Sequence, residues 1–252
     1  MNDLLMKIIF ATLLGLILYQ LSKTPHIETF LNTPNIILIG NIFSDKDHTR
    51  FISIKEQIEK DKNLHFGEII NISKKCSSLK DFKDSVKELK RKYPELDQND
   101  TYAFISIGYN DLLTNVHNCE KAVEVQPHSS PNPGLSKKLP CMTEADIFNK
   151  WKEQLEYFHS TFPQVNIIVL SAYYLPDEST IKECGLNLTP NRHLSSDIDQ
   201  WNADLAQFCM KREWGFVAMD HEFNPKDILS GSIDLNNTAK KHLAELIKQK
   251  VH

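Results

Sequence analysis

The sequence predicts a three-layer α/β/α sandwich built on a five-stranded parallel sheet. Five short apolar runs, each bounded by turn-forming residues, alternate along the chain with stretches of helical periodicity. Continuous apolar runs are typical of strands that are buried on both faces of a parallel sheet. Strands joined through helices in this way form a doubly wound α/β domain. The five runs are 35–40, 66–72, 102–107, 165–171 and 215–219.

The helices are predicted from apolar residues spaced three and four apart, which places them on one face of a helix. Three such stripes are Leu79, Phe82, Val86 and Leu89; Ile147, Trp151, Leu155 and Phe158; and Ile198, Trp201, Leu205 and Phe208. Thr143 with Asp146 resembles a capping box at the start of the second helix, and Ser195 or Ser196 is the expected N-cap of the third. A shorter helix is expected over 51–60 and a final one around 243–247, with Asn236 as its N-cap.

The first residues of the chain are expected to lie outside this domain. Residues 8–22 carry no charge, and with three apolar residues before Lys7 they form a stretch that spans about 27 Å as a helix. We expect a membrane anchor over 1–23, a linker over 24–34 and one domain over 35–252, with the domain outside the cytoplasm. The alternative is a cleaved signal peptide, which would leave a secreted domain.

Composition excludes several classes of function. The chain of 252 residues is 41% hydrophobic and 25% charged, the average of a folded protein. Its net charge is −4, from 29 basic and 33 acidic residues, and it has no basic tract. Because nucleic-acid binding depends on basic side chains that neutralise phosphates, a nucleic-acid partner is not expected. We expect a monomer.

The five cysteines contain no CxxC pair, so a zinc or redox motif is not expected. Two long connections, 112–142 and 172–194, follow predicted strands. Cys119 and Cys141 bracket the Pro-rich part of the first connection, where a disulfide is predicted if the domain is extracytoplasmic.

Polar segments follow the first and third predicted strands and precede the last helix. They read Gly40-Asn41-Ile42, Gly108-Tyr109-Asn110-Asp111 and the six residues 231–236. In a parallel sheet these segments meet at the carboxyl edge, where open α/β folds bind their ligands. Their order along residues 35–250 resembles the SGNH/GDSL hydrolase superfamily, and 108–111 matches its third block. The resemblance implies an esterase-like fold in which the Asn110 side chain contributes to an oxyanion hole.

The chain departs from that family at the positions that carry the chemistry. The family's first block is Gly-Asp-Ser, and here Ile42 stands where the nucleophilic serine belongs. The terminal block should read Asp-x-x-His, and the aligned residues are Gly231 and Asp234. The second block should supply a glycine N–H, and only Ser73 or Cys76 is available there. We therefore expect an SGNH-like protein without serine-hydrolase chemistry that keeps a binding crevice for a glycan or acyl-ester ligand.

An active enzyme with relocated residues is the alternative. Ser44 lies two residues beyond the expected nucleophile, and His221, after the fifth strand, or His48 would serve as its base. Each of these residues also fits a helix cap or a loop, and Asp111 fits a structural contact with backbone N–H groups. An unrelated flavodoxin-like domain is a weaker reading, because no Gly-rich phosphate loop follows the first strand. Asp45, Asp47 and His48 lack a recognised ligand spacing, so neither a metal nor a cofactor is expected.

Overall fold

Five parallel strands form one sheet in the order β2-β1-β3-β4-β5. The strands are β1 (Asn35–Gly40), β2 (Ile69–Asn71), β3 (Thr101–Ser106), β4 (Asn166–Leu170) and β5 (Gly215–Val217). Each falls on one of the apolar runs, with ends shifted by one to three residues for four of the five. The central strand β3 pairs with β1 and β4 over most of its length. The predicted five-stranded parallel sheet is thus confirmed.

The computed structural model describes residues 33–44, 53–61, 64–98, 100–124, 142–176, 180–190 and 192–251. A compact unit spans Pro34–His252. The apolar segment 8–22 lies outside the described residues, as do Asp45, Asp47 and His48. None of the described helices is long and apolar enough to cross a membrane.

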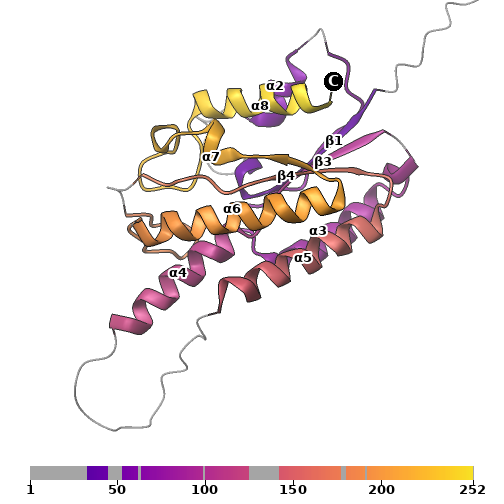
Figure 1. The fold of residues 1–252 in the computed structure, drawn as a ribbon. Coiled ribbons are helices and arrows are strands. Elements are labelled where there is room, and N and C mark those ends of the chain that lie inside the picture. Colours follow the sequence, from indigo (N-terminus) through magenta and orange to yellow (C-terminus); the bar gives the residue numbers. More distant parts are fainter. Residues whose placement is uncertain are drawn as a thin grey trace, which may run out of the picture. The chain divides into compact units, whose positions relative to one another are not determined.

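Helices cover both faces of the sheet (Figure 1). On one face lie α3 (Leu79–Lys92), α5 (Glu144–Thr161) and α6 (Arg192–Arg212), packed side by side. On the other face α2 (Ile54–Glu59) packs against α8 (Asn237–Val251). The remaining described helices are α4 (Tyr109–Glu124), α7 (Met219–Glu222) and the short 3₁₀ turns η1 (Asn41–Phe43), η2 (Leu96–Gln98) and η3 (Pro225–Asp227).

Local sequence signals explain most helix starts. The Thr143 hydroxyl accepts a hydrogen bond from the Asp146 N–H, and the Asp146 carboxylate accepts one from the Thr143 N–H, which is the predicted capping box. The Asn236 side chain accepts from the Ala239 N–H and so caps α8 as predicted. The apolar stripes of α3, α5 and α6 are buried in the core, apart from the partly buried Phe208.

Two expectations were wrong. The connection expected over 112–142 begins as α4, which continues to Glu124. Its many polar residues resemble a loop, but Leu112 and Leu113 are fully buried, so tertiary packing stabilises the helix. Helix α6 starts at Arg192, before Ser195 and Ser196, so neither serine is its N-cap.

Candidate functional site

The turn after β1 places an apolar side chain where the family has its nucleophile. Gly40 has a φ of 124°, and a Cβ there would lie 1.8 Å from the Ser106 carbonyl oxygen of β3. The chain then forms η1, in which the Ile42 side chain is 5% exposed and Phe43 is fully buried. Ile42 is therefore a core residue, and the position carries no nucleophilic atom.

Two donors that would face an oxyanion are used within the protein. Cys76 adopts a φ of 59°, a left-handed conformation that the family's glycine could adopt freely. Its N–H donates to Asn41 Oδ1 at 2.6 Å, and its carbonyl accepts from Asn110 Nδ2 at 3.5 Å. Asn110 is 9% exposed, and its Oδ1 has no hydrogen-bond partner among the described residues. The fold thus brings Asn41 and Asn110 together around Cys76.

A disulfide joins this turn to the connection after β4. Cys76 is bonded to Cys184, 108 residues away. This pair was not predicted from the sequence, although both cysteines follow strands and therefore lie at the carboxyl edge. The side chains of Cys119 and Cys141 lie outside the described residues, so their predicted disulfide stays a prediction. The fifth cysteine, Cys209, is free and buried.

An ion-pair network surrounds Asp234, the residue at which the resemblance to the family would place a histidine. Lys75 Nζ lies 3.2 Å from a Glu183 carboxylate oxygen and 3.6 Å from Asp234 Oδ2. Glu183 also accepts hydrogen bonds from the Ser232 hydroxyl at 2.7 Å and the Ile233 N–H at 3.3 Å. Burial, together with the charge of Glu183, raises the pKa of Asp234. Asp234 therefore belongs to a salt-bridged loop, in which Gly231 adopts a φ of 73°.

Residues 108–111, which match the third block of the family, are fixed by packing on both sides. Gly108 has a φ of 89°, and a Cβ there would lie 2.9 Å from the rings of Trp151 and Trp201. The Tyr109 hydroxyl donates to the Tyr173 carbonyl at 2.7 Å. These contacts hold the start of α4 against α5, α6 and the segment that follows β4.

Asp111 contacts the backbone of the neighbouring helix. Its Oδ2 accepts a hydrogen bond from the Leu79 N–H, the first residue of α3, at 3.0 Å. This is a contact with a backbone N–H of the kind expected for Asp111. Burial raises the pKa of the Asp111 carboxyl to about 6, against the opposing effect of that hydrogen bond. A carboxyl group that titrates near neutral pH therefore lies directly beside Asn110.

The relocated catalytic pair is not joined in this structure. The Ser44 hydroxyl is buried and has no hydrogen-bond partner among the described residues. The His221 side chain, in α7, is 82% exposed, and its nearest carboxylate, at 3.7 Å, is that of Asp220. Hence no hydrogen bond links Ser44 to His221. His48 lies outside the described residues, within which no cluster of three metal-ligating side chains occurs.

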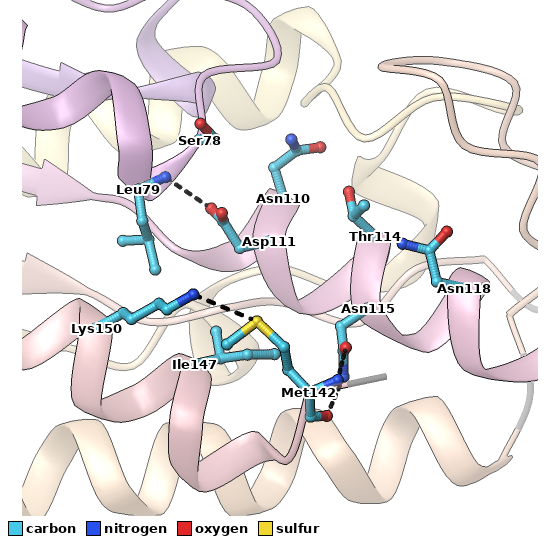
Figure 2. A pocket seen from close by; sticks show the side chains of 10 residues that line it. All are labelled: Ser78, Leu79, Asn110, Asp111, Thr114, Asn115, Asn118, Met142, Ile147 and Lys150. Atoms are coloured by element: carbon cyan, nitrogen blue, oxygen red, sulfur yellow. Dashed lines mark hydrogen bonds between the residues drawn. The ribbon is translucent and has the colours of Figure 1, made fainter. Parts of the chain in front are cut away.

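A cavity of about 420 Å³ opens next to Asn110. It lies between the start of α3, the first turns of α4 and the start of α5 (Figure 2). Its apolar lining is Leu79, Met142 and Ile147, and its charged groups are Asp111 and Lys150. The position of this cavity was not predicted from the sequence, because no helix was expected after Asp111.

Comparison with known proteins rests on structure alone. No protein-family model matches the sequence, and no curated protein is similar to it. Among solved structures, a lipase from a goat rumen metagenome has a TM-score of 0.57 at 12% identity, over 86% of this chain and 96% of the lipase. Phospholipase A1 from Streptomyces albidoflavus has a TM-score of 0.56 at 9% identity, over 86% and 99%. The chain has the SGNH-hydrolase fold.

A carbohydrate esterase is also similar in structure to this chain. A family 3 carbohydrate esterase from Clostridium thermocellum has a TM-score of 0.53 at 13% identity, over 85% of this chain and 93% of that enzyme. At such low identity the likeness concerns the SGNH-hydrolase fold, and each residue's role follows from the contacts described above. We refer to residues 40–42 with Cys76, Asn110 and Asp234 as the edge site.

Proposed function

We propose that this protein is a membrane-anchored, SGNH-hydrolase-like binding protein that lacks serine-hydrolase chemistry. Ile42 is the observation that carries the proposal, because a buried isoleucine at the nucleophile position can neither attack an ester nor hold a water for attack. The bonds from the Cys76 N–H to Asn41 and from Asn110 Nδ2 to the Cys76 carbonyl support it. The Cys76 N–H and one of the two N–H groups of Asn110 Nδ2 are thus engaged within the protein.

The expected loss of activity is large. In serine hydrolases the nucleophile and base act as a unit, and loss of either lowers kcat by a factor on the order of 10⁶. A single oxyanion donor such as Asn110 contributes about 10²–10³, which cannot compensate. The ligand of such a protein would be a glycan or an acyl-bearing molecule bound at the carboxyl edge.

Ester hydrolysis and covalent labelling test this proposal. The full chain should hydrolyse short acyl esters no faster than buffer, and a fluorophosphonate probe should leave it unlabelled. The second candidate, an active esterase, is favoured by one observation, the buried and unpartnered hydroxyl of Ser44. Labelling that disappears in Ser44→Ala would establish that candidate, and loss in His221→Ala as well would identify its base.

We propose that the domain lies outside the cytoplasm, anchored by residues 8–22. The Cys76–Cys184 disulfide supports this placement, because disulfides persist in oxidising compartments. In the host cell, the protein should remain with membranes after washing at high salt and at high pH. A thiol-reactive reagent added before lysis should find Cys76 blocked. Release of the chain in soluble form would favour the cleaved signal peptide instead.

A further inference from the structure

The cavity next to Asn110 suits a small ligand with an apolar body. Its volume of about 420 Å³ falls in the range of roughly 300–1,000 Å³ that small-molecule sites occupy. Most of its lining surface is apolar, and Leu79, Met142 and Ile147 supply the large apolar side chains. A ligand bound here therefore buries an aliphatic or similar group against these three residues.

The Asp111 carboxylate lines the cavity without a counter-ion. The residue is partly exposed, and its Oδ2 accepts a hydrogen bond from the Leu79 N–H at 3.0 Å. No ion pair among the described residues includes Asp111. A carboxylate has about four acceptor sites, so Asp111 can accept further hydrogen bonds from a ligand. Burial raises the pKa of this carboxyl to about 6, as expected for a negative charge that lacks a close cation.

Lys150 brings an ammonium group to the cavity from α5 (Figure 2). Its Nζ donates to Met142 Sδ at 3.5 Å, and a thioether is a weak acceptor. No described carboxylate forms an ion pair with Lys150. Burial has the largest effect on the pKa of Asp111 and raises it, whereas the nearby Lys150 charge lowers it. The two opposite charges thus share the cavity without forming an ion pair with each other.

These two charges discriminate between classes of apolar ligand. An apolar anion would be attracted by Lys150 and repelled by Asp111, and an apolar cation would meet the reverse. An uncharged ligand would remove water from both groups and give neither a counter-ion, which is unfavourable. A molecule that carries one ammonium and one carboxylate group beside an apolar group gives each charge its partner.

We propose that this cavity binds a small zwitterion with an aliphatic side chain, which is the chemistry of a free α-amino acid such as leucine. The ligand's ammonium group donates to the Asp111 carboxylate, and its carboxylate accepts from Lys150. Its side chain packs against Leu79, Met142 and Ile147. The inference goes beyond the proposed function, because this ligand is neither the glycan nor the acyl-bearing molecule proposed for the carboxyl edge.

The test measures binding to the full chain in phosphatidylcholine nanodiscs, with ¹³C-labelled methyl groups of Met142 and Ile147 as reporters. Leucine is compared with 3-methylbutylamine and 4-methylpentanoate, which keep its isobutyl group and lack the carboxylate or the ammonium group. Glycine keeps both charges and lacks the isobutyl group. We expect leucine to shift both methyl signals in a saturable manner and to bind at least tenfold more tightly than each of the other three.

Two charge variants and a matched control locate the binding. Lys150→Met should weaken leucine binding at least tenfold and leave leucine no tighter than 3-methylbutylamine. Asp111→Asn, which keeps an oxygen for the Leu79 N–H, should weaken leucine binding as much and leave leucine no tighter than 4-methylpentanoate. Lys152→Met removes a lysine of α5 that lies over the Phe148 ring, outside this cavity, and should leave leucine binding unchanged. The methyl signals of Ile36 in the sheet report whether each variant is folded.

The inference is overturned if leucine leaves the two methyl signals unchanged, if 3-methylbutylamine, 4-methylpentanoate or glycine binds the wild type as tightly as leucine does, or if both charge variants bind leucine as the wild type does. Its failure is separate from that of the proposed function. Leucine binding with fluorophosphonate labelling would refute the loss of catalysis and keep the inference. An unlabelled chain that binds no leucine would refute the inference alone.

Discussion

At the scale of single residues, the edge site combines turns of positive φ with a buried apolar side chain at position 42. Gly40 and Cys76 hold the left-handed or positive-φ conformations that the turns require, and Asn41 and Asn110 still meet between them. The Ile42 side chain packs into the core at 5% exposure and so fits the turn after β1.

Gly40→Ala tests how strictly the turn depends on glycine. A Cβ would lie 1.8 Å from the Ser106 carbonyl oxygen at a φ of 124°, so β1 or β3 must move. We expect a loss of at least about 2 kcal/mol in the free energy of unfolding, measured by urea titration. Gly185→Ala is the matched control: its φ is 75°, but a Cβ there meets nothing within 4 Å. It should cost about 1 kcal/mol. Equal losses in the two variants would contradict this account.

Asp111 should make stability depend on pH. Its pKa is raised to about 6 in the folded protein, against about 3.9 in an unfolded chain. Between these values the folded state binds the proton more tightly, so the free energy of unfolding falls as pH rises from about 4 to 6. The full difference corresponds to about 3 kcal/mol. Asp111→Asn removes this titration and keeps an oxygen that can accept from the Leu79 N–H. The free energy of unfolding of this variant, relative to that of the wild type, should therefore increase as pH rises.

Unfolding in urea at several pH values between 4 and 7 measures this effect. Asp81, in the first turn of α3, is the control, because hydrogen bonds from Ser78 lower its pKa. The ionised Asp81 carboxylate stabilises the folded protein, and this stabilisation is lost as pH falls. The free energy of unfolding of Asp81→Asn, relative to that of the wild type, should therefore decrease as pH rises toward 7. A pH-independent difference between Asp111→Asn and the wild type would show that this carboxyl titrates normally.

At the scale of elements, loops far apart in sequence are joined across the carboxyl edge. The segment that carries Cys184 and Glu183 is bonded to the turn after β2 by a disulfide and by the ion pair to Lys75. Glu183 also contacts the loop before α8 through Ser232. These contacts join three connections of the sheet on the side of Asp234.

Removal of the disulfide should be strongly destabilising. Cys76 and Cys184 are 108 residues apart, and closing a loop of that length reduces the entropy of the unfolded chain by an equivalent of about 5 kcal/mol. We expect Cys76→Ala/Cys184→Ala to lose most of that free energy in urea unfolding. Cys209→Ala serves as the control for loss of a cysteine, because Cys209 is free. A reducing agent should therefore destabilise Cys209→Ala, which keeps the Cys76–Cys184 disulfide, far more than it destabilises the double variant.

At the scale of the whole molecule, large apolar side chains are almost absent from the exposed residues of the described part of the chain. Met210, 73% exposed, is the one strongly exposed large apolar side chain among the described residues. The continuous apolar stretch of the sequence is confined to its first residues. We therefore expect residues 24–252 to be soluble and monomeric without detergent, while the full chain requires it. Size-exclusion chromatography with light scattering measures both, and aggregation of the shorter chain would contradict the single-domain interpretation.

The sequence by itself determined the sheet and most of the helices. Strand β1 and helix α3 could be predicted from the spacing of their apolar residues. A buried strand and a helix that covers a sheet each bury residues at a characteristic spacing, so the pattern indicates the element. The meeting of Gly40, Asn41 and Asn110 was also predictable, because parallel strands end at one edge. Helix α4 was missed because its sequence is rich in polar residues. Among its described side chains, Leu112 and Leu113 are fully buried, and Tyr109 and Val116 pack against the core.

Only the tertiary structure decided what the edge site contains. The Cys76–Cys184 disulfide, the pairing of Lys75 with Asp234 and the cavity beside Asn110 each join residues from different connections. A long connection leaves its residues many possible partners, and no local pattern selects among them. Their positions are fixed by how the helices pack on the sheet, so the partners of Asp234 and Cys76 follow from three-dimensional packing rather than from spacing in the chain.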